Sequence, residues 1–255
     1  MNCELSKISE WLKVNKLSLN VAKTNYILFR PRQKPITVSD TVTLDNIALQ
    51  QVEVTKVLCV LLDQHLPWKY HHVTKKVSKT IRIISKARFF LSSKSLLSLS
   101  KTLVYPYLNY RNIAWCSTNP SNLNRILNLQ KRIVRIICGT EFLAHTAPLF
   151  WTLKILDIFN INTFLVACFM YSYHNNLLPH TFNTTFVTNR QVHTYNTRNA
   201  NNYRHDFCKT NIKHFTILHL GPKLWNSLPH DFTELTSQSS FKTSLKNYLI
   251  ERAID

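Results

Sequence analysis

The spacing of apolar positions changes along the chain and predicts a mixed N-terminal part followed by helices. Residues 5–12 carry apolar side chains at helical spacing, whereas residues 26–29 (YILF) form a short run that favours a strand. Residues 36–63 are rich in Val, Ile, Thr and Leu, with turn signals at residues 39–40 and 45–46. We expect two or three antiparallel strands in this segment.

From residue 64 onward the apolar period becomes that of amphipathic helices. A first helix is expected over residues 68–91, and a second over residues 95–107, which Pro106 must end or kink. A third helix has signals at both ends, because Asn119 can cap it and Gly139 can stop it. Pro120 also fits its first turn, and its core positions are Leu123, Ile126, Leu127, Ile133, Val134 and Ile137.

The C-terminal part combines helical segments with a polar middle. Residues 147–178 form an apolar helical region, and residues 180–205 are Asn- and Thr-rich, which predicts loop with short strands. Residues 215–229 predict a strand and a Gly-Pro turn, with Trp225 as an aromatic anchor. Residues 239–254 predict an amphipathic helix capped by one of its first two serines.

These patterns predict an α+β fold that is predominantly α. A small antiparallel sheet is expected within residues 24–62, with further short strands near residues 186–220. At least four helices should fill residues 68–178. No run of 18 apolar residues predicts a membrane span.

Positive charge is concentrated in the middle of the chain. The net charge is +19, and residues 64–140 hold 14 basic and no acidic side chains. A segment without carboxylates repels itself unless it meets a polyanion. Nucleic acid is the first candidate for that partner, and an anionic membrane surface is the second.

Two sets of cations lie opposite the apolar faces of the predicted helices. Lys75, Lys79, Arg82 and Lys86 are spaced by four, three and four residues, which gives a stripe about 16 Å long. Arg125, Lys131, Arg132 and Arg135 share the solvent side of the third helix. The alternative is an ordinary solvated face, but such faces normally mix both signs of charge. We therefore interpret both sets as candidate contacts for a phosphate backbone.

Chemistry for a self-contained catalytic site is not visible in the sequence. The 13 acidic residues form no D-D, D-x-D or E-x-x-E grouping, and two glycines cannot build a phosphate-binding loop. The six cysteines include no C-x-x-C pair, and the neighbouring histidines 65, 71 and 72 have no matching second pair, so no metal site is predicted. A reducing intracellular location, nucleus or cytoplasm, fits this cysteine usage, and no secretory signal is apparent.

Several segments, in this order, resemble the C-terminal half of a non-LTR (LINE-type) retrotransposon reverse transcriptase. They include "WLKVNKLSLNVAKTNYILF", "VLCVLLDQHLPWKYHH", "LVYPYLNYRNIAWCS", "HTAPLFWTLKILDIF", "VHTYNTRNA", "GPKLWNSLP" and "SFKTSLKNYL". The resemblance implies a palm remnant at 1–63, a thumb-like helical domain at 64–140 and a C-terminal tail region at 141–255. It also implies that Leu58, Cys59 and Val60 belong to a primer-grip hairpin.

The resemblance further implies that the catalytic centre lies in sequence preceding Met1. In the intact family, upstream strands carry the Y/F-A-D-D motif that binds Mg²⁺, and further endonuclease and polymerase regions precede them. No cofactor is expected for this chain itself. Lys23 matches a palm lysine that lies near the departing pyrophosphate, although a solvated turn residue explains it equally well.

Three glycines expected from the family motifs are replaced. Cys59, Arg111 and Cys116 stand in their places, and the whole chain has only two glycines where average usage gives about 18. Glycine serves where φ is positive or where two backbones approach closely. We therefore expect disturbed geometry at the hairpin and in the thumb, as in a decaying copy of a mobile element.

The leading interpretation is a truncated reverse transcriptase that binds RNA or DNA without sequence preference and has no polymerase activity alone. Residues 1–63 should then leave an apolar face uncovered. One alternative is a domesticated, non-enzymatic RNA- or DNA-binding or interaction protein, and another is a decayed copy without function. A third is a protein that binds membrane surfaces through basic amphipathic helices. We disfavour membrane binding because the apolar faces of these helices are needed for the core.

Overall fold

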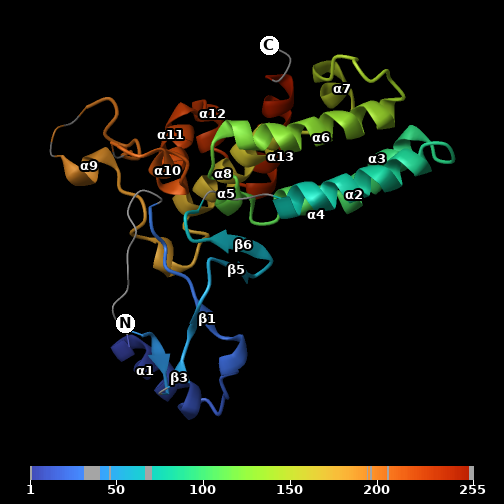
Figure 1. Cartoon of the computed structure of the whole chain (residues 1–255). Helices are drawn as coiled ribbons and strands as arrows, with labels where there is room; N and C mark the ends of the chain where they lie inside the picture. Colours follow the sequence, from blue (N-terminus) through green and yellow to red (C-terminus); the bar gives the residue numbers. More distant parts are fainter. Residues whose placement is uncertain are drawn as a thin grey trace. The chain divides into compact units, whose positions relative to one another are not determined.

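The computed structural model describes residues 2–31, 41–45, 47–66, 71–193, 195, 197–205 and 207–252 (Figure 1). The predicted turn at residues 39–40 and the expected helix start at residue 68 lie outside these ranges. The chain divides into two compact units, Met1–Lys69 and Tyr70–Asp255. The three-part division at residues 63 and 140 stays a prediction.

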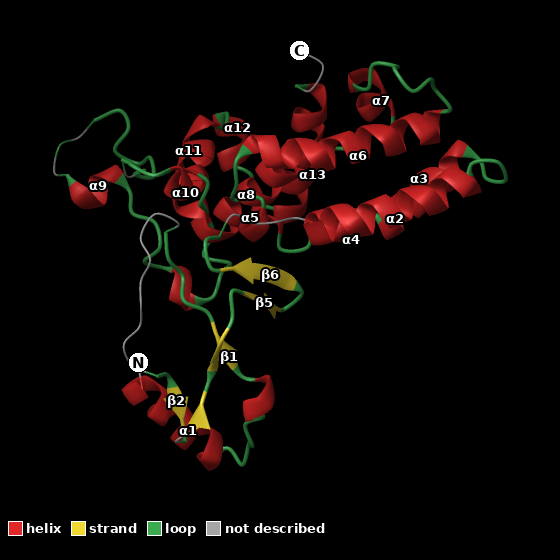
Figure 2. Ribbon diagram, viewed as in Figure 1, coloured by secondary structure: helices red, strands yellow, loops and turns green. Residues whose placement is uncertain are grey.

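The structure confirms an α+β chain that is predominantly α (Figure 2). Its α-helices are α1 (Asn2–Val14), α2 (His71–Ala87), α3 (Ser93–Leu103), α4 (Tyr105–Asn109), α5 (Asn112–Trp115), α6 (Pro120–Cys138), α7 (Ala147–Thr152), α8 (Ile158–His174), α9 (Asn189–Val192), α10 (Asn211–His214), α11 (Ile217–Ser227), α12 (His230–Thr233) and α13 (Gln238–Glu251). The 3-10 helices are η1 (Val21–Lys23) and η2 (His180–Phe182). The strands are β1 (Asn25–Tyr26), β2 (Thr43–Leu44), β3 (Ile47–Ala48), β4 (Gln50–Gln51), β5 (Val54–Val57) and β6 (Val60–Asp63).

The strands of the first unit form three two-stranded sheets rather than one. β2 pairs with β3 and β5 with β6, both antiparallel, whereas β1 pairs with β4 in parallel. Asp45, between β2 and β3, holds α1 in place. It accepts hydrogen bonds from Ser9 Oγ at 2.6 Å and Lys13 Nζ at 3.2 Å. These bonds lower the pKa of the Asp45 carboxyl below its usual value.

Large apolar side chains of the first unit remain exposed among its described residues. Trp11 is 59% exposed and Val14 81%, and both lie on α1, whose buried contact is made by Ser9. Ile8 and Leu17 are also exposed. An exposed set of this kind usually marks a surface that another element or partner covers.

The hairpin of β5 and β6 contains the strained turn that the glycine replacement suggested. Val57 pairs with Val60, so Leu58 and Cys59 form a two-residue loop, with φ values of 45° and 67°. Two successive positive φ values define a type I′ hairpin turn, which favours Asn-Gly. The turn therefore keeps a hairpin geometry, and the two non-glycine residues in it carry backbone strain.

The second unit begins with helices α2 to α6, which pack into a bundle (Figure 1). The end signals of α6 are confirmed, because the Asn119 side chain accepts the Ser121 N–H at 3.0 Å and Gly139 has φ 66°. Pro106 lies in the first turn of α4, so the predicted second helix is indeed divided. Buried side chains of α2 and α6 form the core between them, among them Val77, Ile81, Ile84, Ile126, Ile133, Val134 and Ile137.

Helix α8 forms the second core, against α11 and α13. Tyr171 is buried, stacks on Phe241 with ring centroids 4.4 Å apart, and donates a hydrogen bond of 2.8 Å to the Leu235 carbonyl. Trp225 is also buried, as its interpretation as an anchor predicted. The helix predicted near the C-terminus is confirmed as α13, although no serine side chain caps it.

The prediction of a strand and a Gly-Pro turn at residues 215–229 is wrong. Residues Ile217–Ser227 form α11, with Gly221 and Pro222 inside it. A Cβ on Gly221 would lie 2.7 Å from Met170 Sδ, so glycine here permits close approach of α11 to α8. Packing of the helix pair thus overrides two residues of low helix propensity.

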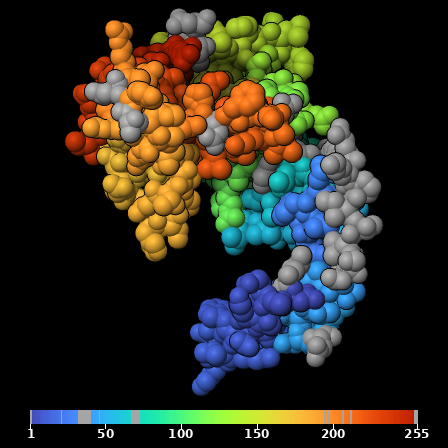
Figure 3. Space-filling view, turned by 90° about the vertical axis from the view of Figure 1, so that its left-hand side faces the viewer, coloured from blue at the N-terminus to red at the C-terminus, as the bar shows by residue number. Residues whose placement is uncertain are grey.

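The polar region at residues 180–205 is mostly loop, as predicted, but the short strands expected near residues 186–220 do not form among the described residues. A single bridge between Thr188 and Tyr203 is the strand pairing that its described residues show, beside η2 and α9. In the space-filling view, the segment that follows α8 projects from the surface of the second unit (Figure 3).

Candidate nucleic-acid interface

The four cations predicted on the first basic helix lie together on α2. Lys75, Lys79, Arg82 and Lys86 are all exposed. The buried side chains Val77, Ile81 and Ile84 lie on the opposite side of the same helix, so the stripe cannot turn inward without losing the core. Lys76 extends the basic surface, with its Nζ 6.0 Å from the ring centroid of Tyr107.

The second set of cations lies on α6, opposite its buried face. Arg125 and Arg132 are exposed, and Lys131 and Arg135 are half-buried. Arg135 is held in place, because its Nε donates a hydrogen bond of 2.9 Å to the Ala144 carbonyl and its guanidinium lies 6.0 Å from the Phe142 ring centroid.

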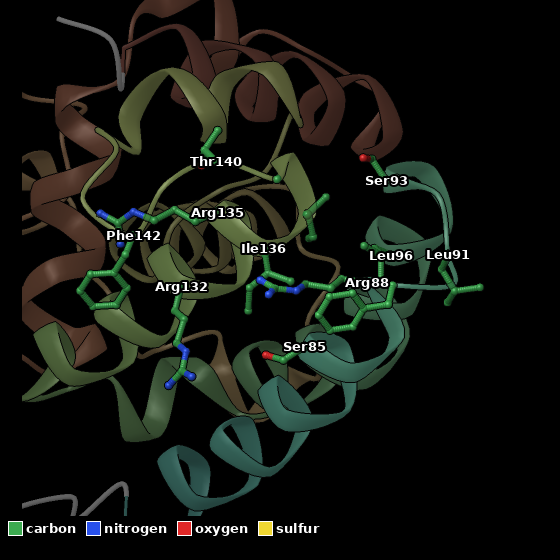
Figure 4. Close-up of a pocket in the computed structure, with 13 residues that line it drawn as sticks. Ser85, Arg88, Leu91, Ser93, Leu96, Arg132, Arg135, Ile136, Thr140 and Phe142 are labelled. Atoms are coloured by element: carbon green, nitrogen blue, oxygen red, sulfur yellow. The ribbon is translucent and has the colours of Figure 1, made fainter.

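The C-terminal ends of α2 and α6 enclose an open cavity of about 480 Å³. Arg132 and Arg135 line it from α6, and Ser85 of α2 and Arg88, just after the end of α2, line it from the other side (Figure 4). Exposed aromatic rings lie at its margins: Phe142 beside Arg135, and Phe89, whose ring centroid is 4.7 Å from the Arg88 guanidinium carbon. The cavity therefore combines three guanidinium groups with apolar surface.

None of the eight predicted cations forms an ion pair with a residue that the structure describes. The ion pairs found there join Lys7 to Glu4 and Lys13 to Asp45, both in the first unit. Residues 64–140 contain no carboxylate that could neutralise α2 or α6 locally. The positive potential of this surface is thus uncompensated within its own helices.

The sequence pattern missed several residues of this surface. Arg88, Phe89 and Phe142 line the cavity, but Arg88 falls outside the four-residue stripe of α2. Phe142 follows the end of α6, in a segment without a periodic pattern. For Arg88 and Phe89 the available signal is the sequence Arg-Phe-Phe at residues 88–90, which places an arginine next to aromatic side chains.

The sites predicted in the first unit lie apart from one another along the chain. Leu58 and Cys59 form the exposed turn of the β5–β6 hairpin, and Val60 begins β6. Lys23 is the exposed last residue of η1. The primer-grip role of the hairpin and the role of Lys23 stay predictions.

Among the described residues, one group of three or more His, Cys, Asp or Glu side chains is close enough to hold a metal ion, and it contains no carboxylate. Within the described chain, no helix combines the length and apolar character needed to cross a bilayer.

Comparison with known proteins gives one informative relative. Over 160 residues, which are 60% of this chain, the sequence is 28% identical to the "Probable RNA-directed DNA polymerase from transposon X-element" of Drosophila melanogaster. The match spans 17% of that protein, so the chain covers about a sixth of its length. No protein-family profile and no solved structure matches the chain. The similarity supports a relationship between this region and retrotransposon reverse transcriptases.

Proposed function

We propose that the chain is a C-terminal segment of a reverse transcriptase and binds RNA or DNA through the phosphate backbone. The observation that carries this proposal is the pair of cation sets on the packed helices α2 and α6, with no carboxylate in residues 64–140. Cations on a helix face reach phosphates rather than base edges, so binding has little sequence preference.

The similarity to an RNA-directed DNA polymerase supports a nucleic-acid partner over other polyanions. In this proposal, α2 to α6 act as the thumb that holds a duplex, and the exposed apolar side chains of α1 are covered by upstream palm strands. Those strands would carry the metal-binding carboxylates. The chain alone has nucleic-acid affinity without polymerase chemistry.

The test measures binding of labelled single- and double-stranded RNA and DNA of several sequences over a series of salt concentrations. If six of the eight cations contact phosphates, the slope of log K against log salt is about −4 to −5.4, depending on strandedness. The double variant Lys79→Glu, Arg82→Glu should weaken binding equally for all sequences. Its salt slope should flatten by about one unit for each phosphate that the variant no longer binds.

A matched control is available on α13, where Lys242 and Lys246 are also exposed and four residues apart. The variant Lys242→Glu, Lys246→Glu changes net charge by the same amount and should weaken binding much less. Equal weakening by both variants would mean that net charge alone drives association. Stronger binding to anionic vesicles than to oligonucleotides at equal salt would favour the membrane-surface alternative.

A further inference from the structure

A cluster of histidine and cysteine side chains lies at the start of α11, away from the basic helices in sequence. Cys208 and His219 are buried, and His214 is exposed. One ligand atom from each of these three residues lies within 4.8 Å of the other two. The residue spacing is irregular, so the absence of a C-x-x-C pair left the cluster unrecognised in the sequence.

The two closest contacts of the cluster both involve the ring of His219. Cys208 Sγ lies 3.1 Å from His219 Nδ1, and His214 Nδ1 lies 3.2 Å from His219 Nε2. Tetrahedral zinc, with bonds of about 2.0–2.3 Å to nitrogen and sulfur, places its ligand atoms about 3.3–3.6 Å apart. Each separation taken alone is within a few tenths of an ångström of that spacing, but the two contacts use opposite nitrogens of the His219 ring. One ligand atom from each of the three residues lies within 4.8 Å of the others, so a small movement of the exposed His214 ring is needed for all three to face one ion.

Local structure holds the cluster together without a metal. His219 lies in the first turn of α11, and its N–H donates to the Thr216 carbonyl at 3.1 Å. Thr216 Oγ1 in turn donates to the Lys213 carbonyl at 2.8 Å, which fixes the turn between α10 and α11. His214, the last residue of α10, is therefore held near His219.

A fourth side chain of suitable chemistry is adjacent. The ring of His205 meets that of His219 edge to face, with centroids 5.8 Å apart, and His205 is exposed. Because His205 and His214 are exposed, the cluster is reached from solvent on the side of these two rings. One thiolate with two or three imidazoles is a ligand set that suits zinc, whereas Mg²⁺ prefers oxygen ligands.

We propose that Cys208, His214 and His219 bind one Zn²⁺ ion, with His205 as the fourth ligand. His219 contacts Cys208 through Nδ1 and His214 through Nε2, and one ion can bind only one of these nitrogens. Binding at Nδ1, beside Cys208, therefore requires the exposed His214 ring to rotate toward that side. Cys208 binds as the thiolate and releases its proton to solvent. The ion then ties α10 and α11 to the preceding loop, and this role is independent of nucleic-acid binding by α2 and α6.

The experiment uses the full chain, freed of metal by a chelator and then exposed to Zn²⁺ or Co²⁺. We expect one zinc ion per chain after desalting, measured by elemental analysis. The cobalt form should show intense d–d absorption of tetrahedral coordination and thiolate-to-cobalt charge transfer. Zinc should also raise the Tm, because an ion bound only by the folded state stabilises that state.

The variant Cys208→Ser should abolish the charge-transfer band and weaken zinc binding by more than the about 10–100-fold typical of outer-shell changes. His214→Asn, at an exposed position, should weaken binding without unfolding the chain, which circular dichroism checks. His205→Asn should weaken it as well. Cys59→Ser and His193→Asn, which change exposed residues outside the cluster, are the matched controls and should bind like the parent.

Two results would overturn the zinc site. One is retention of no more zinc by the parent chain than by Cys208→Ser. The other is equal loss of zinc in the cluster variants and in the two control variants, which would indicate adventitious binding to scattered histidines. Oligonucleotide affinity is also measured before and after zinc is removed by a chelator. Unchanged affinity would show that the zinc site and the basic helices act independently.

Discussion

Asn162 on α8 donates a hydrogen bond of 2.8 Å through Nδ2 to Oδ1 of Asn112, which begins α5 and is only 1% exposed. Asn112 in turn donates from Nδ2 to the Leu108 carbonyl at 2.8 Å. This chain of amides joins α5 to α8 through two residues that are 50 positions apart in the sequence. Because buried polar groups are costly when unpaired, the pair fixes how α5 approaches α8.

Replacing Asn112 by Ala should lower the free energy of unfolding by about 1–3 kcal/mol, because it leaves the Asn162 amide and the Leu108 carbonyl without this partner. Urea denaturation of the single variants Asn112→Ala and Asn162→Ala and of the double variant measures the coupling. The double variant should cost less than the sum of the single variants. Strict additivity would show that the two amides do not depend on each other.

Arg111 stands where the resemblance to reverse transcriptases predicts glycine, and it has φ 50°, in the left-handed region. Arg111→Gly should therefore raise the free energy of unfolding of the second unit by up to about 1.5 kcal/mol, because it removes about 1–2 kcal/mol of strain and adds about 0.5–1 kcal/mol of chain entropy cost. Thermal denaturation measures the change. Cys116→Gly is the control: this position has φ −77° and a buried side chain, so the substitution should destabilise.

Stability should fall as the solution becomes alkaline, because burial raises the pKa of several thiol and phenol groups. Burial raises the pKa of Cys168 to about 11 and of Tyr203 to about 12, with Lys242 opposing the first shift and Tyr173 adding to the second. The contribution of these two groups to the free energy of unfolding is fully present below their unfolded pKa values of 9.0 and 10.0. It is lost as the pH rises toward their folded pKa values.

Urea denaturation between pH 8 and pH 12 provides the test, with Tyr203→Phe as the comparison. The loss of stability between pH 10 and pH 12 should be smaller in this variant, which has no phenol to ionise at that position. Taking the difference between the two proteins cancels the effect of lysine deprotonation, which both share. Parallel pH profiles would contradict the raised pKa of Tyr203.

The chain with template, primer, deoxynucleotides and Mg²⁺ should extend no primer above background. Two-metal phosphoryl transfer needs clustered carboxylates, and the described residues contain no such group. Gel analysis of primer extension at enzyme excess measures this. Incorporation that survives repurification and disappears in an acidic-residue variant such as Asp63→Asn would refute the expectation.

The sequence by itself determined those features that depend on neighbouring residues. Periodicity located α2 and α6 and gave the exposed stripe of Lys75 to Lys86, because a helix that buries Val77 and Ile84 must expose the residues opposite them. The first and last residues of α6 could also be predicted from the sequence, because Asn119 caps the helix and Gly139 ends it through local backbone geometry.

The tertiary structure decided those features that depend on residues far apart in the chain. Gly221 and Pro222 suggested a turn, but the close approach of α11 to Met170 makes them part of a helix. The positive φ of Arg111 shows that packing can hold a residue in a conformation its own side chain disfavours. The cavity lined by Arg88 and Phe142 and the contact between Cys208 and His219 were also decided by tertiary packing. A local sequence pattern does not specify which distant side chains meet when apolar faces are buried together.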